Sequence, residues 1–536
     1  MFWADELAAS VTGPQVVNDS KTPSGTVHVG SLRGPVILDV IARALRARGL
    51  PTTLLYGVDD LDPMDAQALL TPDAVERSMG VPLANVPDPA DDGHASYARH
   101  FAQRFIATFD RLGIRPDVTY WMSDLYRSGQ MDRWIRVALD RAAVVREVYA
   151  RVANVRHPAE WHPLSVICES CGRIGTTIVT AWDPERGTVA YECRRDLVTW
   201  ATGCGHAGET SPFGGHAKLP FNVDWAAKWS EFGVTIEPNG KDLGTRGGAR
   251  DRSEALAREV FDREPPVNLV YEFLNIGGRK MSTSRGTGAA ATEIAEVVPP
   301  EQLRLLFLRP RPNQAISFDP DGTDAIPRLF DESDRLAAAT AGLDVRGELP
   351  ADAAHVFAAT LVDPAADAAA EAALHRPPFG HLALLVQVPG VDVVERMTAE
   401  KGSALTERER ALLDERVAAA RAWLATYAPD RVRVAVQASL PPAVADLDPD
   451  QREFLAALAA RLDADDVAWT GESLQNEIFT AARDRELAPG RAFAALYAAF
   501  LGQASGPRAG WLLASLERDF VSRRLGEAAE AGTLDA

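Results

Sequence analysis

The stretch Thr22-Pro23-Ser24-Gly25-Thr26-Val27-His28-Val29-Gly30 decides the fold class, because of what lies on either side of it. An apolar segment at 15–18 precedes it and predicts a strand. Apolar residues at helical spacing over 36–45 predict a helix, and 52–57 predicts a second strand. This order is typical of an α/β fold with a doubly wound, Rossmann-type parallel sheet, which binds ligands at the carboxyl ends of its strands.

The quoted loop is suited to binding a phosphate group. Backbone N–H groups and the helix dipole favour an anion at the start of the predicted helix. Gly30 leaves room for a base or ribose beside the backbone, and His28 can donate a hydrogen bond to a phosphoryl group. The alternative is a solvent-exposed loop in front of a capped helix.

A second loop, Gly277-Gly278-Arg279-Lys280-Met281-Ser282-Thr283-Ser284-Arg285-Gly286, combines one ammonium group with several hydroxyl groups. Such a loop can clamp a triphosphate, although by itself it also fits a solvated surface turn. The two loops are separated by an α/β region and an insertion. Together they indicate a triphosphate-binding site much more specifically than either loop does alone.

Acidic residues follow the second predicted strand at the expected ligand edge of the sheet. They are Asp59, Asp60 and Asp62. We expect them to bind a substrate ammonium group, and the alternative is a solvated turn before Pro63.

The composition changes over 151–215, where Cys, Gly and Thr are frequent, and this change indicates an inserted module. It contains all four cysteines of the chain, Cys168, Cys171, Cys193 and Cys204. Four thiolates predict a tetrahedral structural Zn²⁺, with His206 as a possible replacement for Cys204 and unliganded thiols as the alternative. Disulfides are not expected in a large cytoplasmic protein.

Length and composition limit the classes of protein. A chain of 536 residues is too long for one core, and its 46% hydrophobic and 24% charged residues are globular proportions. A net charge of −19 argues against wholesale binding of nucleic acid, but not against a local basic track. Only 6 of the 56 basic residues are lysine. No apolar run predicts a membrane span and no signal peptide is recognised, so we expect a cytoplasmic protein without a membrane partner.

The two loops resemble the signature motifs of class I aminoacyl-tRNA synthetases, and the whole chain resembles the class I lysyl-tRNA synthetases. The segments that carry this resemblance are Thr22–Gly30, Gly233–Asp242, Tyr271–Gly288, 299–301, 312–319 and 495–508. The resemblance therefore extends from one end of the chain to the other.

The resemblance implies a domain order and an activity. The implied regions are a Rossmann-type catalytic domain at 1–150 and 216–290, a Cys-rich, zinc-binding insertion at 151–215, a helical stem-contact region at 291–345 and an all-α anticodon-binding region at 346–536. The implied enzyme, a lysine–tRNA ligase, uses ATP and Mg²⁺ to activate lysine as an aminoacyl adenylate. It then transfers the lysyl group to tRNA, in this case tRNA-Lys.

The resemblance also assigns roles to residues. The implied catalytic residues are His28, Lys280 and Ser282. The implied ATP-binding residues are Thr22, Pro23, Ser24, Gly30, Lys280, Met281 and Ser284. The implied amino-acid-binding residues are Ser20, Thr22, Asp59, Phe221 and Leu243.

Some positions depart from the family pattern. The family usually has Gly, Trp and His at three positions where this chain has Ser20, Phe221 and Leu243. The change of Trp and His removes a hydrogen-bond donor and an ionisable ring. A pocket that selects through polar contacts is redirected when these contacts change. Two alternatives are therefore a paralogue that uses another amino acid or acceptor, and a non-catalytic tRNA-binding protein.

Overall fold

The computed structural model describes residues 2–65, 71–276, 290–388, 391–433, 435–463 and 467–531, and the backbone of 279 and 280. The chain forms two compact units. The first comprises 1–296, 300–318 and 347–368, and the second comprises 297–299, 319–346 and 369–536.

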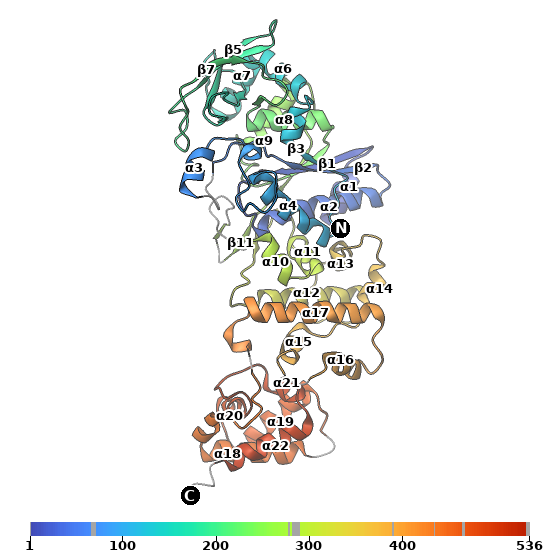
Figure 1. Cartoon of the computed structure of the whole chain (residues 1–536). Helices are drawn as coiled ribbons and strands as arrows, with labels where there is room; N and C mark the ends of the chain where they lie inside the picture. The colour runs from blue at the N-terminus through green and yellow to red at the C-terminus, as the bar shows by residue number, and fades with distance from the viewer. Residues whose placement is uncertain are drawn as a thin grey trace. The chain divides into compact units, whose positions relative to one another are not determined.

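A five-stranded sheet in the order β10-β9-β1-β2-β3 forms the centre of the first unit (Figure 1). Its strands are β1 Gln15–Lys21, β2 Thr52–Val58, β3 Val118–Trp121, β9 Ile236–Gly240 and β10 Val267–Tyr271. All four neighbouring pairs are parallel. This confirms the Rossmann-type fold class, and the two strands predicted around the first loop are β1 and β2.

The strand order reverses between β1 and β9. From β1 the chain builds outward to β2 and β3, and it later builds to the other side with β9 and β10. A doubly wound sheet binds its ligand in the crevice at such a reversal.

Helices cover both faces of the sheet (Figure 1). Figure 1 shows α2 and α4 on one side and α8 and α9 on the other. The helices of this unit are α1 Trp3–Ser10, α2 Arg33–Ala47, α3 Pro72–Ser78, α4 Tyr97–Arg111, α5 Met122–Arg127, α6 Asp132–Asp140, α7 Ala142–Ala153, α8 Phe221–Phe232, α9 Ala249–Glu259, α10 Ala291–Val297, α11 Pro300–Leu308 and α13 Ala353–Thr360. Because both faces are covered, strand residues such as Val17 and Ile236 are fully buried.

The Cys-rich segment between β3 and β9 adds small antiparallel sheets. One pairs β4 Ser165–Val166 with β8 Ala217–Lys218, and the other joins β5 Thr177–Asp183, β6 Thr188–Cys193 and β7 Ala207–Thr210. A further sheet, in the order β12-β11-β13, contains β11 Leu274–Ile276, β12 Arg279–Lys280 and β13 Ile316–Ser317.

The second unit is built from helices, and no strand occurs in the part of it that the structure describes. Its helices are α12 Ala325–Thr340, α15 Phe379–Leu385, α16 Val393–Lys401, α17 Glu407–Thr426, α18 Pro449–Leu462, α19 Gly471–Asp484, α20 Pro489–Leu501, α21 Ala509–Ala514 and α22 Arg518–Glu530, and α14 Ala368–Ala372 begins at the boundary of the units. Apolar side chains of α18 to α22 form one buried cluster. The prediction of an all-α C-terminal region is confirmed.

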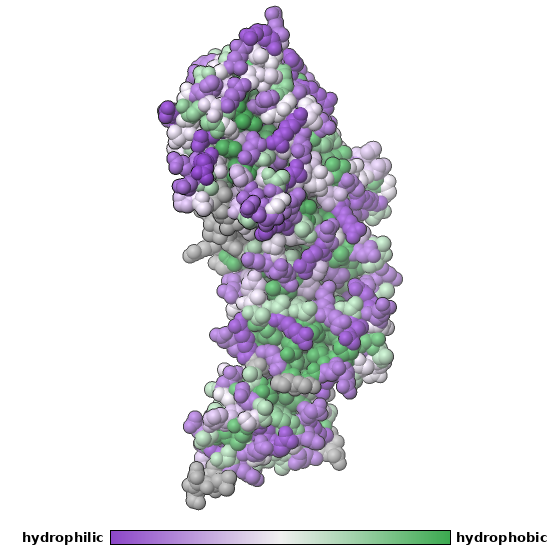
Figure 2. Space-filling model, in the orientation of Figure 1, coloured by the Kyte–Doolittle hydropathy of each residue, from purple (hydrophilic) through white to green (hydrophobic). Residues whose placement is uncertain are grey.

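Hydrophilic side chains cover much of the face seen in Figure 2, as expected for a chain with 75 acidic residues. Among the described residues, no helix combines the length and apolar character needed to cross a membrane.

Candidate active site

A cavity of about 400 Å³ lies at the reversal of strand order, with residues from the ends of β1, β2 and β9 and the start of α8 in its wall. The residues predicted for nucleotide or substrate that line it are Ser20, Thr22, Ser24, His28, Gly30, Asp59, Phe221 and Leu243. The topology thus gathers into one cavity side chains that are separated by more than two hundred positions in the sequence.

Pro23 lies elsewhere, and the side chains predicted in the second loop lie outside the described residues. Pro23 lines a separate cavity of only about 10 Å³. Lys280 ends β12, and its side chain lies outside the described residues, as do Met281, Ser282 and Ser284.

His28 stands at the start of the helical segment that faces the cavity. It precedes a 3₁₀ turn, Val29–Leu32, which leads directly into α2. The backbone of His28 is extended and forms a bridge with Ala290. This arrangement directs the first turn toward the cavity, where its N–H groups can bind a phosphate group.

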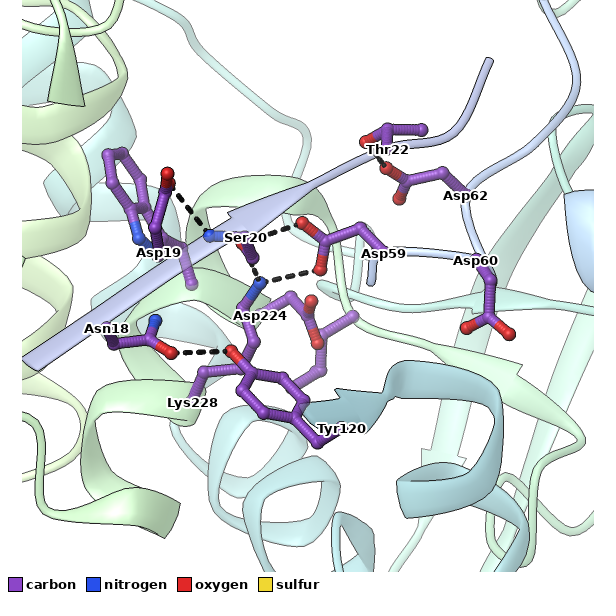
Figure 3. A network of polar contacts seen from close by, with 12 residues as sticks. Asn18, Asp19, Ser20, Thr22, Asp59, Asp60, Asp62, Tyr120, Asp224 and Lys228 are labelled. Atoms are coloured by element: carbon purple, nitrogen blue, oxygen red, sulfur yellow. Dashed lines mark hydrogen bonds and ion pairs between the residues drawn. The ribbon is translucent and has the colours of Figure 1, made fainter. Parts of the chain in front are cut away.

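A buried ring of hydrogen bonds joins Ser20 and Asp59, which line the cavity, to Lys228 (Figure 3). The Lys228 ammonium donates to Asp59 Oδ1 at 2.6 Å and to Ser20 Oγ at 3.0 Å. The Ser20 hydroxyl in turn donates to Asp59 Oδ2 at 2.8 Å. Burial alone would raise the pKa of Asp59, but Lys228 and these hydrogen bonds hold it below its ordinary value. Asp59 and Lys228 are therefore a charged, mutually neutralised pair.

A second buried lysine neutralises the neighbouring acids. Lys218 Nζ lies 2.9 Å from Asp62 Oδ1 and 3.4 Å from Asp224 Oδ2. The Thr22 hydroxyl donates to Asp62 Oδ2 at 2.6 Å (Figure 3). Thr22, predicted to contact the amino acid, is thus oriented by Asp62.

Asp19, on the β1 side of the cavity, is not neutralised in this way. Its Oδ1 accepts the Ser20 N–H at 2.8 Å, and among the described residues it has no ion-pair partner. Burial, Glu237 and Asp59 raise the pKa of Asp19 to about 8, although the Ser20 N–H and Lys21 act against them. A cationic ligand would reverse this shift.

Two residues of β9, Glu237 and Asn239, line the same side of the cavity as Asp19. The Glu237 carboxylate accepts hydrogen bonds from the indole N–H of Trp225 at 2.7 Å and of Trp229 at 2.6 Å. Asn239 is 3% exposed, and its Oδ1 has no hydrogen-bond partner among the described residues. This oxygen can accept a hydrogen bond from water or from a ligand in the cavity.

Sequence patterns did not predict four residues of this region, Asp19, Lys218, Lys228 and Glu237. One signal was available for the lysines, since this chain uses arginine for most of its cations and yet has lysine at both positions.

The structure brings the four predicted cysteines together. Their Sγ atoms lie within 4.8 Å of one another, and the fourth member of the group is Cys204 rather than His206. Cys168 and Cys204 are 3.7 Å apart, as are Cys171 and Cys193. Four thiols at this spacing can hold a tetrahedral metal ion.

A second group that could hold a metal ion was not predicted from the sequence. It contains Asp92, His94 and His100, whose potential ligand atoms lie within 4.8 Å of one another. His100 is 1% exposed, and its Nδ1 lies 3.0 Å from Asp88 Oδ1. The group is formed by a loop that folds back onto α4, so its short-range sequence spacing gave little signal.

Comparisons of the sequence with known proteins identify the family of this chain. The family model "tRNA synthetases class I (K)" matches residues 1–358, and the model "Anticodon binding domain" matches 428–529. The lysine–tRNA ligase of Methanosarcina barkeri is 32% identical over an alignment of 549 positions that covers 98% of each chain. That of Archaeoglobus fulgidus is 31% identical over 98% of this chain and 99% of its own. A solved glutamate tRNA ligase from Elizabethkingia meningosepticum aligns with 96% of this chain and 99% of its own, at 11% identity and a TM-score of 0.40. The chain belongs to the class I tRNA synthetases of the K type.

Proposed function

We propose that this protein is a lysine–tRNA ligase, which activates lysine with ATP and transfers the lysyl group to tRNA-Lys in the cytoplasm. The observation that carries the proposal is one cavity at the reversal of strand order, lined by a helix start suited to a phosphate group and by Asp19, a buried acid without an ion-pair partner among the described residues. The lysine–tRNA ligases that match 98% of this chain support the same reaction.

Binding of lysine is assigned to the β1–β9 side of the cavity. Asp19 supplies a carboxylate, and Asn239 supplies an acceptor oxygen, toward a ligand that carries ammonium groups. Charge-assisted hydrogen bonds of this kind are about twice as strong as neutral ones. Asp59, in the wall of this cavity, is already paired with Lys228, so we assign the substrate ammonium group to Asp19.

ATP is assigned to the side of the cavity formed by His28 and Gly30. The helix start fits an anionic group, because its N–H groups and dipole favour negative charge. ATP supplies the phosphoryl group that activates the carboxylate, and Mg²⁺ is expected to accompany it. His28 would donate a hydrogen bond to phosphate oxygens, and Gly30 would lie against the nucleoside.

Zinc is assigned to the four cysteines, where it would be structural because four thiolates leave no open position. We expect the Zn²⁺ content per chain to fall by one in Cys171→Ser, as measured by elemental analysis of the purified protein. His206→Ala is the matched control and should keep the same content. Equal content in Cys171→Ser and the wild type would exclude this site.

A different amino acid remains the second candidate, and the ring of Ser20, Asp59 and Lys228 favours it. In that ring Ser20 adds a hydroxyl group at a position where the family usually has Gly, while Phe221 and Leu243 make the wall more apolar. These changes alter the polar contacts through which such a pocket selects its substrate.

ATP–pyrophosphate exchange across the twenty amino acids, with and without total tRNA, tests both candidates. Exchange with lysine is the expected result. Exchange with another amino acid would support the second candidate and remove the lysine assignment. No exchange with any amino acid, with tRNA still bound, would indicate a non-catalytic tRNA-binding protein.

A further inference from the structure

The cavity at the sheet edge combines many acids with one strongly basic side chain. Of the described residues that line it, five are acidic, and only Lys21 is a lysine or arginine. The acids are Asp19, Asp59, Glu237, Asp242 and Glu272. An amino acid brings its own carboxylate into this negatively charged surrounding, where the acids repel it. A cation in the wall therefore has a direct use in binding such a ligand.

Lys21 stands at the carboxyl end of β1. It is the last residue of that strand and lies opposite Val58 of β2 in the parallel register. The order of the sheet reverses at β1, and a doubly wound sheet binds its ligand at the carboxyl ends of the strands at such a reversal. The ammonium group is thus carried by the central strand of the binding site, directly before the loop that leads to His28.

Lys21 and Asp19 share one face of β1. Side chains two positions apart on a strand point to the same side, and their positions are about 7 Å apart along the strand. Ser20, between them, points to the opposite face and meets Lys228 there. One face of β1 therefore offers a carboxylate and an ammonium group side by side. This pair complements the ammonium and carboxylate groups of an amino acid.

The stem of Lys21 lies against apolar side chains. Lys21 is partly buried, and it also lines the small cavity of about 10 Å³, together with Val27, Val58 and Phe105. None of the described residues in that small wall is acidic, so this side offers the ammonium group no carboxylate. A lysine in such a place keeps its stem on the apolar surface and its charge toward polar surroundings, which here are those of the main cavity.

The fold does not neutralise Lys21. Among the described residues no carboxylate forms an ion pair with it, in contrast to Lys218 and Lys228. Burial lowers the pKa of Lys21, although Asp19 and Asp242 act against this effect. A partly buried cation without an ion pair costs folding free energy, so stability gives no reason for a lysine at this position.

We propose that Lys21 binds the carboxylate of the amino acid substrate and orients it toward ATP, while Asp19 holds an ammonium group of the same molecule. This inference rests on the proposed function, because it requires an amino acid and ATP to meet in this cavity. Lys21 donates to one carboxylate oxygen, and the other oxygen forms a bond with the α-phosphorus of ATP. The bond between this phosphorus and the pyrophosphate oxygen breaks, and pyrophosphate leaves with the electron pair. No proton is transferred in this step.

The test compares the binding of lysine with that of lysinol, in which a hydroxymethyl group replaces the carboxylate. Isothermal titration calorimetry of the full chain measures both dissociation constants and does not depend on catalysis. Lys21→Met should raise the Kd of lysine roughly 10- to 150-fold, as for a lost hydrogen bond between charged groups, and leave the Kd of lysinol unchanged. Unchanged binding of lysinol also shows that the variant is folded. Lys21→Arg keeps the charge and should restore most of the affinity for lysine.

Asp19→Asn should give a different pattern in the same cavity. It removes the partner of an ammonium group, which both ligands carry, so the Kd values of lysine and lysinol should rise together. Arg46→Met is the matched control, since it removes a surface cation that is paired with Asp117 and lies outside the cavity wall. This variant should leave both Kd values as in the wild type.

Two results would overturn the inference. One is that Lys21→Met weakens the binding of lysine and lysinol equally, or of neither ligand. The other is that Lys21→Met weakens the binding of ATP alone, which would assign the ammonium group to a phosphate group.

Pyrophosphate exchange by the wild-type protein separates this inference from the proposed function. Exchange with lysine, but equal effects of Lys21→Met on lysine and lysinol, would keep the enzyme and remove this role of Lys21. No exchange with any amino acid, with the difference between the two ligands intact, would remove the proposed function and keep the carboxylate site. Exchange with another amino acid would remove the lysine assignment, and that amino acid and its alcohol would then replace lysine and lysinol in the same comparison.

Discussion

Two buried acids of the main cavity, Asp59 and Asp19, differ in whether a cation pairs with them. Asp59 in the cavity wall is paired with the buried Lys228, while Asp62 and Asp224, which do not line this cavity, share Lys218. On the β1–β9 side, Asp19 has no ion-pair partner among the described residues, and burial with nearby acids raises its pKa to about 8. Paired charges hold the fold together, and an unpaired buried acid is available to a ligand. We infer that Asp19 belongs to the binding side of the cavity and that Asp59 and Lys228 belong to its structural side.

Replacing Lys228 tests the structural side and has the largest expected effect. Lys228→Met leaves the Asp59 carboxylate buried without its cation, which should lower the free energy of unfolding by about 3–5 kcal/mol. Denaturation with urea measures this change. The control is Lys241→Met, which removes an ion pair with Glu272 from a side chain that is 47% exposed and should cost about 1 kcal/mol or less. Equal losses in both variants would show that burial does not distinguish the two pairs.

Replacing Asp19 tests the binding side. Asp19→Asn keeps the shape but removes the charge, so the KM for lysine should rise roughly 10- to 150-fold, as for a lost hydrogen bond between charged groups. Pyrophosphate exchange at varied lysine concentrations measures this value. Asp117→Asn, which affects a surface carboxylate paired with Arg46, should leave the KM unchanged. A similar KM in all three proteins would remove Asp19 from the lysine site.

The pH dependence of the KM for lysine tests the same difference between Asp19 and the paired acids. Asp19 is largely protonated below its pKa of about 8, and only the carboxylate form attracts an ammonium group. The KM for lysine should therefore fall as the pH rises from 6 toward 8, by up to about tenfold per pH unit, and then become constant. Asp19→Asn should abolish this dependence. Retention of the same slope in the variant would assign it to another group.

Ser20 has the smallest expected effect. Ser20→Gly removes one hydroxyl from the ring with Asp59 and Lys228 but leaves the ion pair, so the free energy of unfolding should fall by about 1–2 kcal/mol. Thermal unfolding measures the change, with Lys228→Met as the reference. A loss as large as that of Lys228→Met would show that the ring acts as one unit and not mainly as an ion pair.

Sequence patterns predicted the features that depend on residues close to one another along the chain. The strand, loop and helix around Thr22–Gly30 follow from local periodicity, and Asp59 follows β2 directly, so both reached the correct edge of the sheet. Lys228 could not be assigned in this way, because it lies 208 positions from Ser20 and meets it only through the order of the strands. The two tryptophan N–H groups that hold Glu237 likewise come from a helix that periodicity describes only as apolar.

The paired indoles give the site an optical property. Trp225 lines the cavity, donates its N–H to Glu237 and lies 5.5 Å from Phe221, measured between ring centroids. A charged ligand that enters the cavity changes the electric field at this indole. Ligand entry should therefore change the contribution of Trp225, one of 11 tryptophans, to the protein fluorescence, and comparison with Trp225→Phe isolates that contribution without a radioactive substrate or an attached dye.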